Sequence, residues 1–367
     1  MTETLSRRAL NRALLARQHL LARTRAPIAE LVEHLLGLQA QATLPPYVGL
    51  WSRLEDFDPE QLGRMIAERE LVRLTLMRGT VHMVTPRDAA FLRPLVQMAI
   101  ERGHNGVFGR RMGGAEPAAL AAAVREELAR ADEPLTAREI ARRLIARGIG
   151  DEPEAIGNAT RVHVPLVQVP PRGILGAGGQ AKYATLEDWT GRSTEPEPSR
   201  ERLVLRYLGA FGPATVMDIQ NWSGVTRLKE VVDPLRDRLQ TFADEDGKEL
   251  FDLPDAPRPD PGTPAPVRLL GEYDNVLLGH ADRRRIIPAD YPWDTILGAG
   301  RNVGNLLVDG ELRANWWLER EGRRATTLAI RPFGALDPAD RDAVAAEAGA
   351  LLGLVAPGAA LRFEPPL

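Results

Sequence analysis

Cysteine is absent from this 367-residue sequence, which excludes a disulfide framework, a zinc site built on thiolates and a cysteine nucleophile. Lysine is scarce, since it occurs only at Lys182, Lys229 and Lys248. No apolar run approaches the roughly 20 residues that span a bilayer. The N-terminal segment is charged throughout, unlike a signal peptide. We therefore expect a cytoplasmic protein.

Several enzyme motifs are also missing. The glycine stretches at 176–179 and 298–302 match neither a P-loop nor a dinucleotide fingerprint, because no lysine follows in the required place. A Gly-x-Ser-x-Gly segment is lacking too, which leaves a serine hydrolase unsupported. We expect no nucleotide or other cofactor.

The remaining composition is that of a globular protein, with 44% hydrophobic and 26% charged residues. The length predicts two or three domains. A net charge of −3 argues against a histone-like grip on nucleic acid. The basic residues are nearly all arginine, which binds phosphates through two parallel hydrogen bonds and stacks on bases. A GC-rich genome explains the arginine content equally well.

The order of predicted elements indicates an α+β protein built from three helix-turn-helix units with β-wings, that is, tandem winged-helix units, followed by a β-rich region. We place the units at 1–85, 86–190 and 191–255, and the C-terminal region with its terminal helix at 256–367. In the first unit, helices are predicted at 5–22, 27–37, 47–54 and 58–69, and strands at 71–76 and 80–84.

The second and third units contain a short sequence repeat. The segment 134–140 matches 213–219 at its proline, threonine, acidic and isoleucine positions. Thr136 and Glu139 have the spacing of a capping box. The second unit is predicted to have helices at 86–102, 117–129 and 155–166, a loose loop at 103–106, and a wing of strands 167–169 and 182–185. The third is predicted to have helices at 199–211 and 226–239 and a hairpin of 240–243 and 249–253. Chance also explains so short a repeat, but the matching element order favours duplication.

The C-terminal region is predicted to be mainly β. Strands are expected at 267–270, 306–308, 312–318, 325–331 and 361–363, with a charged hairpin at 318–324. Asp337 is the expected cap of a last helix, which ends near residue 354.

Two glutamines, Gln39 and Gln41, lie among apolar residues just after the predicted helix 27–37. In an extended segment, residues i and i+2 project to the same side. The pair would then present matched amide donors and carbonyl acceptors to one point. On spacing alone, two solvated or helix-capping glutamines are the favoured interpretation.

A polar strand face is predicted close to this segment. Arg78, Thr80 and His82 alternate with apolar residues and would line a pocket beside the glutamines. A single histidine on a strand is as often satisfied by a neighbouring backbone group. The segments 272–275 and 280–283 contain carboxylates and one histidine, which suit Mg²⁺ or Mn²⁺ in a nuclease. The adjacent arginines 283–285 oppose a cation site, so a polar network is favoured there.

Four basic residues lie on the predicted recognition helices or wings. These candidates for phosphate contact are Arg161, Arg172, Lys182 and Arg227. For any one of them taken alone, a solvated surface charge is the favoured interpretation.

Three segments resemble a known family when taken together and in order. They are Leu38-Gln39-Ala40-Gln41-Ala42, Arg78-Gly79-Thr80-Val81-His82 and Leu277-Leu278-Gly279-His280-Ala281-Asp282-Arg283. Across nearly its whole length the chain resembles the AlkZ/YcaQ-type winged-helix DNA glycosylases.

This resemblance implies a C-shaped cradle for duplex DNA, a monomer, and a catalytic Gln-x-Gln loop at Gln39 and Gln41. It implies excision of N7-alkylated purines. The related branch carries Gln-x-Asp, so Gln41 implies the branch that unhooks interstrand crosslinks from azinomycin-type antibiotics and gives the producer self-resistance. Because a crosslink spans both strands and obstructs full base flipping, we expect an open cleft, with the hairpin 318–324 and Trp316 or Trp317 probing the duplex near the lesion. The DNA contacts that we add for the strand, the third segment and the hairpin are Arg78, Thr80, His82, Arg283, Trp316, Arg320, Arg323 and Arg324.

The chemistry agrees with this assignment. An N7-alkylguanine is already cationic, so it leaves without a strong general acid, and the sugar gains oxocarbenium character. Two neutral glutamines would hold a water beside the anomeric carbon, with their carbonyl dipoles favouring the developing positive charge. No lysine lies near the loop, so we expect a monofunctional enzyme without a Schiff-base step. A DNA-binding regulator without catalysis and a metal-dependent nuclease are the alternatives.

Overall fold

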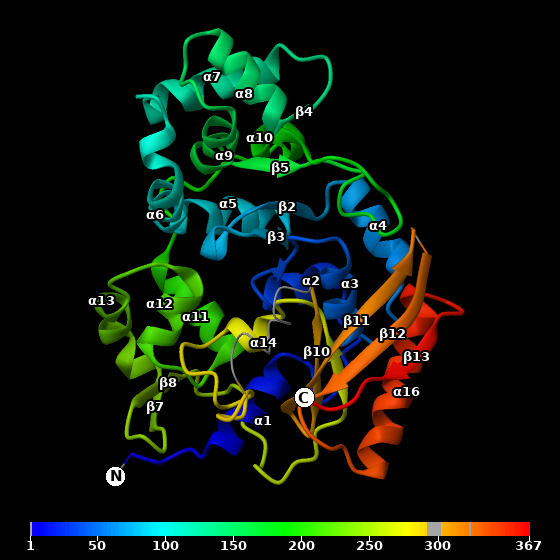
Figure 1. The fold of residues 1–367 in the computed structure, drawn as a ribbon. Helices are drawn as coiled ribbons and strands as arrows, with labels where there is room; N and C mark the ends of the chain where they lie inside the picture. Colours follow the sequence, from blue (N-terminus) through cyan, green and yellow to red (C-terminus); the bar gives the residue numbers. More distant parts are fainter. Residues whose placement is uncertain (1, 292–301, 323) are drawn as a thin grey trace.

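The computed structural model describes residues 2–291, 302–322 and 324–367, and it is a mixed structure of helices and mainly antiparallel sheets, with β12 and β13 as a parallel pair (Figure 1). The described α-helices are α1 (Arg7–Arg17), α2 (Ile28–His34), α3 (Leu44–Trp51), α4 (Pro59–Ala67), α5 (Pro86–Leu95), α6 (Gln97–Phe108), α7 (Pro117–Ala129), α8 (Ala137–Ala146), α9 (Pro153–His163), α10 (Leu186–Thr190), α11 (Arg200–Phe211), α12 (Val216–Ser223), α13 (Lys229–Val232), α14 (Asn275–Leu278) and α16 (Pro338–Val355). The described 3-10 helices are η1 (Met77–Gly79), η2 (Gly109–Arg111) and η3 (Asp233–Arg238). The described strands are β1 (Leu38–Gln39), β2 (Val72–Thr75), β3 (Val81–Val84), β4 (Leu135–Thr136), β5 (Leu166–Gln168), β6 (Lys182–Thr185), β7 (Gln240–Ala243), β8 (Glu249–Asp252), β9 (Arg268–Leu270), β10 (Gly304–Val308), β11 (Glu311–Glu321), β12 (Arg324–Pro332) and β13 (Ala360–Phe363).

One order of elements occurs three times: a helix, a short strand or bridge, two helices, and a β-hairpin. The three sets are α2-β1-α3-α4-β2-β3, α7-β4-α8-α9-β5-β6, and α11-α12-α13-β7-β8 with an isolated bridge at Ala214 before α12. In each set the short strand pairs with the second strand of the hairpin, through Gln39↔His82, Leu135↔Tyr183 and Ala214↔Phe251. Gln39 therefore lies in the short strand of the first set.

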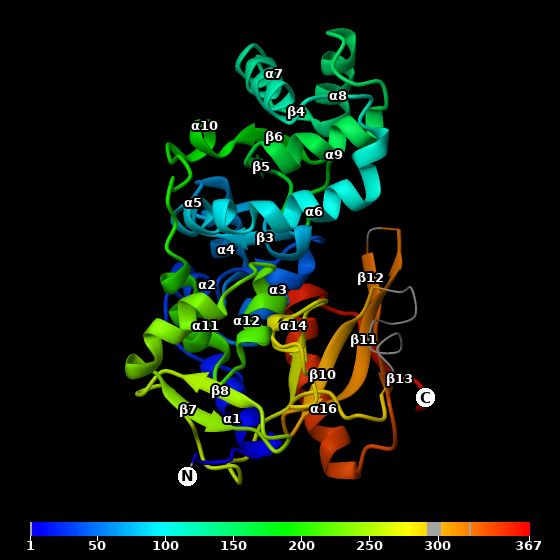
Figure 2. The same ribbon diagram turned by 90° about the vertical axis from the view of Figure 1, so that its left-hand side faces the viewer.

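The first two hairpins belong to one sheet. Its strand order is β1-β3-β2-β5-β6-β4, and the pair Leu74↔Val167 joins β2 to β5. Nothing in the sequence pattern predicted this continuity. A second sheet has the order β13-β12-β11-β10-β9, with α16 alongside it and β11–β12 as its longest hairpin (Figure 2).

The predicted capping box at Thr136 is confirmed. The Thr136 hydroxyl oxygen accepts from the Glu139 backbone N–H at 3.2 Å, and the Glu139 carboxylate accepts from the Thr136 N–H at 2.8 Å. Thr215 and Asp218 form the same reciprocal pair at the start of α12. The two copies of the sequence repeat thus start equivalent helices in the same way. The predicted caps Asp58 and Asp337 are confirmed as well.

Several predicted boundaries in the first half of the chain were wrong. The first helix ends at Arg17 rather than at 22, because His19 has a left-handed φ of 53°. The predicted helix 86–102 is two helices, which meet at Val96 where ψ is 1°. The predicted loop 103–106 lies inside α6. Its two glycines lower helix propensity, but they do not break this packed helix.

The predicted recognition helix 226–239 was also wrong in part. Only Lys229–Val232 is α-helical, and the 3-10 helix η3 follows it. Pro234 lacks a backbone N–H, so the α-helical ladder cannot continue there. The predicted C-terminal strands are confirmed, although β11 and β12 are longer than expected and carry the predicted hairpin 318–324.

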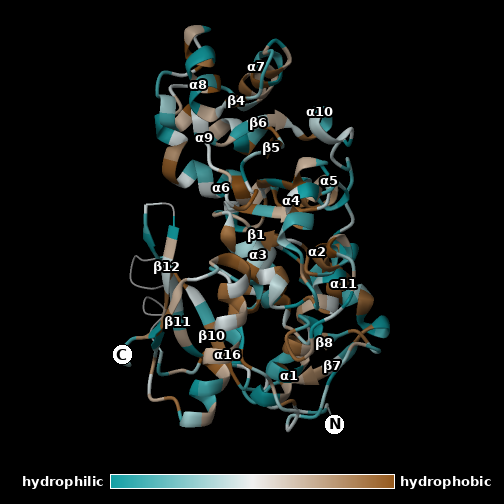
Figure 3. Cartoon of the chain, turned by 90° about the vertical axis from the view of Figure 1, so that its right-hand side faces the viewer, coloured by the Kyte–Doolittle hydropathy of each residue, from teal (hydrophilic) through white to brown (hydrophobic). Residues whose placement is uncertain are grey.

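Buried ion pairs connect distant parts of the chain. Arg17 on α1 pairs with Asp252 on β8 at 2.6 Å, and Arg53 after α3 pairs with Asp274 before α14 at 2.7 Å; all four side chains are buried. Apolar residues gather around β1 at the centre of the molecule, while the tip of the β11–β12 hairpin is polar (Figure 3). In the parts of the chain described, the helices are all too short or too polar to cross a membrane.

Candidate catalytic site

Gln39 and Gln41 lie along strand β3, to which β1 is paired. The Ala40 backbone N–H between them donates to the Val81 carbonyl at 2.7 Å, and Gln39 pairs with His82. The two side chains differ in depth. Gln39 is 8% exposed, whereas Gln41 is exposed. The extended backbone therefore brings both amides to one strand, with one amide inside and one at the surface.

The bonding partners dictate how the two amides are turned. The Gln39 Oε1 atom accepts from a guanidinium nitrogen of Arg78 at 3.0 Å, and the Gln41 Oε1 atom accepts from the Val81 backbone N–H at 3.2 Å. Neither partner can accept a hydrogen bond, so neither amide can be flipped. Each oxygen uses one lone pair toward the protein. The second lone pair of each oxygen remains for the water or the sugar that we expect at this point from the sequence.

Arg78 is a charged residue that hydrogen-bonds the Gln39 side chain. It lies in η1 with a left-handed φ of 56°, and its second terminal nitrogen donates to the Trp222 carbonyl of α12 at 3.3 Å. Burial lowers the pKa of Arg78 to about 10, and the nearby charge of Arg283 acts in the same direction. Arg78 thus joins the glutamine strand to the third set of elements while remaining charged at neutral pH.

His82 does not reach the surface, so its predicted DNA contact is corrected. The ring is fully buried, and Nδ1 lies 3.0 Å from the Thr80 carbonyl, which only accepts hydrogen bonds. Nδ1 therefore carries the proton, and Nε2 is an acceptor 3.4 Å from Arg78. Burial lowers the pKa of His82 to about 3, with a further contribution from the charge of Arg78. The plainer interpretation from the sequence, a histidine satisfied by backbone, is confirmed.

Arg73 is a buried residue that hydrogen-bonds the backbone of the glutamine loop. Its guanidinium donates to the Ala40 carbonyl, its side chain is 2% exposed, and burial lowers its pKa to about 10. Arg17 and Arg53 have buried carboxylate partners, whereas no described carboxylate bonds to Arg73 or Arg78. The glutamine loop consequently lies in an excess of positive charge, which favours a polyanionic ligand.

The remaining predicted contacts near the glutamines are Thr80 and Arg283. Thr80 is half-buried, and its hydroxyl donates to the Met77 carbonyl at 3.2 Å. Arg283 is half-buried, and it is close enough to Arg78 to influence its charge. A DNA contact by either residue stays a prediction.

Four predicted phosphate contacts lie in the second and third sets of elements, and one of them, Arg172, is close enough to Arg73 that its charge adds to burial in lowering the pKa of Arg73. Arg172 follows β5 and is half-buried, and Arg161 on α9 donates to Asn158. The other two form surface ion pairs, Lys182 with Glu133 at 3.3 Å and Arg227 with Glu230 at 2.8 Å. Such exposed pairs contribute little to stability, so both cations can exchange their partner for a phosphate.

The β11–β12 hairpin exposes only some of the residues that were predicted to contact DNA. Arg320 and Arg324 are exposed near its tip, while Arg323 lies outside the described residues. Trp316 is 3% exposed, and its indole N–H donates to the Leu270 carbonyl at 3.0 Å. The predicted contact of Trp316 with DNA is therefore corrected, because its ring packs in the C-terminal core, and the alternative Trp317 is buried as well.

Among the side chains proposed as an alternative metal site, Asp274, Asp282 and His280 have other partners, and Glu272 is half-buried. Asp274 pairs with Arg53, and the Nε2 atom of His280 lies 3.0 Å from the Phe211 carbonyl. Asp282 bonds to Arg284. Within residues 2–291, 302–322 and 324–367, no cluster of three metal-ligating side chains occurs.

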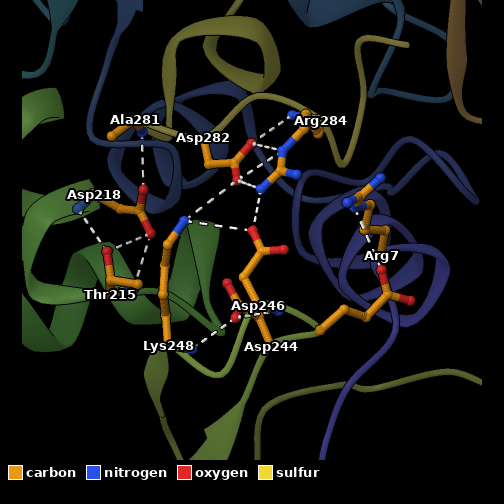
Figure 4. A network of polar contacts seen from close by, with 10 residues as sticks. Arg7, Thr215, Asp218, Asp244, Asp246, Lys248, Ala281, Asp282 and Arg284 are labelled. Atoms are coloured by element: carbon orange, nitrogen blue, oxygen red, sulfur yellow. Dashed lines mark hydrogen bonds and ion pairs between the residues drawn. The ribbon is translucent and has the colours of Figure 1, made fainter. Parts of the chain in front are cut away.

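The segment 281–285 forms the polar network that the sequence favoured. Arg284 bridges Asp282 and Asp246, the latter at the tip of the β7–β8 hairpin, and Lys248 lies within 3.8 Å of both carboxylates (Figure 4). The Ala281 N–H donates to Asp218 at 2.8 Å. This network lines an open pocket of about 530 Å³ and fastens the third hairpin to the segment that contains Arg283.

Sequence reasoning missed Arg73. Its position two residues into β2 gives no sign that its side chain reaches the Ala40 carbonyl. Gly173 is a partial signal, since a Cβ there would lie 2.6 Å from the Arg73 side chain.

Comparisons with known proteins define the class. The chain matches the family model described as DNA glycosylase AlkZ-like over residues 32–354. It is 27% identical over 339 residues to an interstrand DNA cross-link repair glycosylase from Streptomyces sahachiroi, covering 86% of this chain and 88% of that protein. The solved structure of Streptomyces sahachiroi DNA glycosylase AlkZ has the same fold, with a TM-score of 0.72 and 20% identity over 98% of this chain and all of that one.

The protein is therefore a DNA glycosylase, an enzyme that acts on DNA. More particularly, because the match spans most of its length, the chain belongs to the AlkZ-like DNA glycosylase family. This confirms the family resemblance read from the three segments.

Proposed function

We propose that this enzyme hydrolyses the N-glycosidic bond of N7-alkylated purines and unhooks interstrand crosslinks in duplex DNA. The observation that carries the proposal is the pair Gln39 and Gln41, held along β3 in an excess of positive charge. The relative from Streptomyces sahachiroi is named for cross-link repair, which supports the crosslink as substrate. The azinomycin-type crosslink and a self-resistance role rest on the family resemblance of Gln-x-Gln.

Neutral amides suffice because the leaving group is already activated. An N7-alkylpurine carries a positive charge that the departing bond electrons neutralise, so no acid has to protonate it. What remains is to place a water beside the anomeric carbon. Each glutamine oxygen keeps a second lone pair, which can accept a hydrogen from that water.

The absence of a lysine nucleophile supports a monofunctional reaction. All three lysines form ion pairs elsewhere, Lys182 with Glu133, Lys229 with Asp233 and Lys248 with Asp246. A Schiff base needs an amine beside the sugar. The expected products are therefore the free base and an abasic site in an otherwise intact strand.

The three repeated sets of elements are proposed to be tandem winged-helix units that cradle the duplex. We keep the divisions 1–85, 86–190, 191–255 and 256–367, and the enzyme is proposed to act as a monomer. The β11–β12 hairpin, which exposes Arg320 and Arg324 near its tip, is proposed to probe the duplex near the lesion. The cleft is proposed to stay open, because a crosslinked base is attached to both strands and cannot be flipped fully out of the duplex.

Product analysis tests this proposal. A duplex with a single N7-methylguanine, and one with an N7–N7 guanine crosslink, are incubated with the protein in EDTA. Release of free alkylated base, leaving an uncut strand with an abasic site, is the expected result. Strand cleavage that requires Mg²⁺ would instead indicate the nuclease. Sequence-selective binding without product would indicate the regulator.

A further inference from the structure

Arg78, His82 and the Thr80 carbonyl form a hydrogen-bonded chain that ends on Gln39. The Arg78 terminal nitrogen Nη2 lies 3.0 Å from Gln39 Oε1 and 3.4 Å from His82 Nε2, so its two hydrogens can serve both acceptors. The other terminal nitrogen donates to the Trp222 carbonyl at 3.3 Å. The direction of every bond is fixed, because guanidinium groups only donate and carbonyls only accept.

We infer that Arg78 is a positioning residue for the glycosylase reaction, which holds the Gln39 amide in one orientation and is itself held by His82 and the third set of elements. This inference rests on the proposed function of Gln39. Among the described residues, Arg78 alone hydrogen-bonds the Gln39 side chain. Without that bond, the amide can rotate and exchange its oxygen for its nitrogen.

The backbone supports this role. Arg78 has a left-handed φ of 56°, an uncommon conformation for a residue with a side chain, and Gly79 follows with 68°. The Thr80 backbone N–H donates to the Met77 carbonyl at 3.2 Å, so Arg78 and Gly79 are the two central residues of a tight hairpin turn, in which two positive φ values are usual. From this turn the guanidinium reaches Gln39 Oε1 at 3.0 Å.

Electrostatics distinguishes positioning from charge stabilisation. The transition state gains positive charge on the sugar, and a guanidinium close to it is repulsive. If Coulomb energy dominated, removal of Arg78 would accelerate the reaction. If orientation dominates, removal slows it, because misplacing a catalytic group costs up to roughly a hundredfold in rate.

The test compares single-turnover rate constants for base release from the N7-methylguanine duplex. Arg78→Met is expected to lower the rate constant about tenfold or more in the wild-type background. In a Gln39→Asn background, whose shorter amide does not reach residue 78, the same change should alter the rate by less than about twofold, since Arg78 acts through Gln39. Equal losses in both backgrounds, or a faster Arg78→Met enzyme, would overturn the inference.

Matched variants separate positioning from folding and from DNA binding. Arg93 is also buried, its pKa is likewise lowered to about 10 by burial, and it bonds the Val162 carbonyl far from the glutamines. Arg93→Met should destabilise the protein without changing the rate constant. If Arg78→Met does not fold, Arg78→Lys replaces it in the test. A smaller loss of rate is then expected, because the ammonium still donates hydrogen bonds but lacks the planar fork of the guanidinium.

The salt dependence of DNA affinity supplies an independent readout. A residue that contacts no phosphate leaves the slope of log K against log salt unchanged on substitution, whereas loss of one phosphate contact reduces it by about one. Arg78→Met should leave the slope unchanged, because the positioning role replaces the DNA contact that the sequence predicted for Arg78. A full rate in Gln39→Ala would refute the proposed site itself. An inactive Gln39→Ala together with a fully active Arg78→Met would refute only the inference about Arg78.

Discussion

At the scale of single residues, burial decides what each polar side chain near β3 can do. Gln39 is nearly buried and Gln41 is exposed, so the two amides of one motif meet different surroundings. His82 lies wholly inside and stays neutral, because burial and the charge of Arg78 hold its pKa at about 3. The groups that bond the glutamines therefore keep one protonation state at neutral pH.

This predicts a reaction rate that is independent of pH around neutrality. The pKa of His82 is lowered to about 3 and that of Arg78 to about 10, so neither group titrates between pH 6 and 8.5. The single-turnover rate constant for base release should change by less than about twofold across that range. A bell-shaped profile with limbs inside this window would show that a titrating acid or base takes part.

The burial of Trp316 predicts that its substitution affects the stability of the fold rather than DNA binding. Its ring is buried, and a Cβ added to Gly304 would lie 2.2 Å from it, so the glycine leaves just the space that the indole fills. Trp316→Ala should lower the free energy of unfolding by about 3–5 kcal/mol in urea titrations. Met217→Ala, at a 60% exposed position, is the control and should change it by at most about 0.5 kcal/mol. Unchanged stability in Trp316→Ala would contradict the packing.

At the scale of elements, the short strands matter more than their length suggests. β1 consists of two residues, yet it sets the register between Gln39 and His82. Its equivalents, β4 and the bridge at Ala214, close the second and third hairpins in the same way. Only the first set of elements carries glutamines at this position.

The β11–β12 hairpin is predicted to contact DNA through its exposed tip. Arg320→Ala and Arg324→Ala should each weaken binding of any duplex and lower the salt slope by about one, as expected for phosphate contacts. Fluorescence anisotropy at several salt concentrations measures both effects. Arg130→Ala is the control, since that exposed residue is the C-cap of α7, outside the hairpin. If all three variants changed the affinity and the salt slope equally, the prediction that the hairpin contacts DNA would be contradicted.

Local signals in the sequence predicted helices and strands well where caps and alternation are strong. The capping box at Thr136 and the hairpin at 318–324 are examples. Prediction failed where long-range packing decides, as at the break between α5 and α6 and the merging of two hairpins through Leu74 and Val167. The motif identified Gln39 and Gln41, but the grip of Arg73 on the loop depends on tertiary contacts that no spacing reveals.

At the scale of the whole molecule, interior cations tie the repeats together. Arg17 joins α1 to β8, Arg53 joins the first set of elements to the segment before α14, and Arg78 reaches α12. The first two arginines have carboxylate partners and stabilise the fold. The third has no carboxylate partner among the described residues, and its guanidinium instead hydrogen-bonds Gln39 and the Trp222 carbonyl.

Stability should fall in mild acid. Burial lowers the pKa of His82 and of His280 to about 3, below the ordinary value of 6.5. Below pH 6.5 the unfolded chain binds protons at these histidines and the folded chain does not, so stability is lost as pH falls toward 3. Each histidine contributes about 1.4 kcal/mol per pH unit. Urea titrations at pH 8.5, 7.5, 6 and 5 should show a plateau and then a decline. A constant free energy of unfolding would refute the burial of neutral histidines.

The central claim, that the Gln39 amide directs water onto the sugar of an alkylated nucleotide, is tested most directly by one comparison. Single-turnover release of free N7-methylguanine is measured in EDTA for the wild type, Gln39→Ala and Gln41→Ala, with duplex affinity measured alongside. We predict that Gln39→Ala slows release by about a hundredfold or more, that Gln41→Ala also slows it, and that affinity changes little. Release by Gln39→Ala at the wild-type rate would contradict the account.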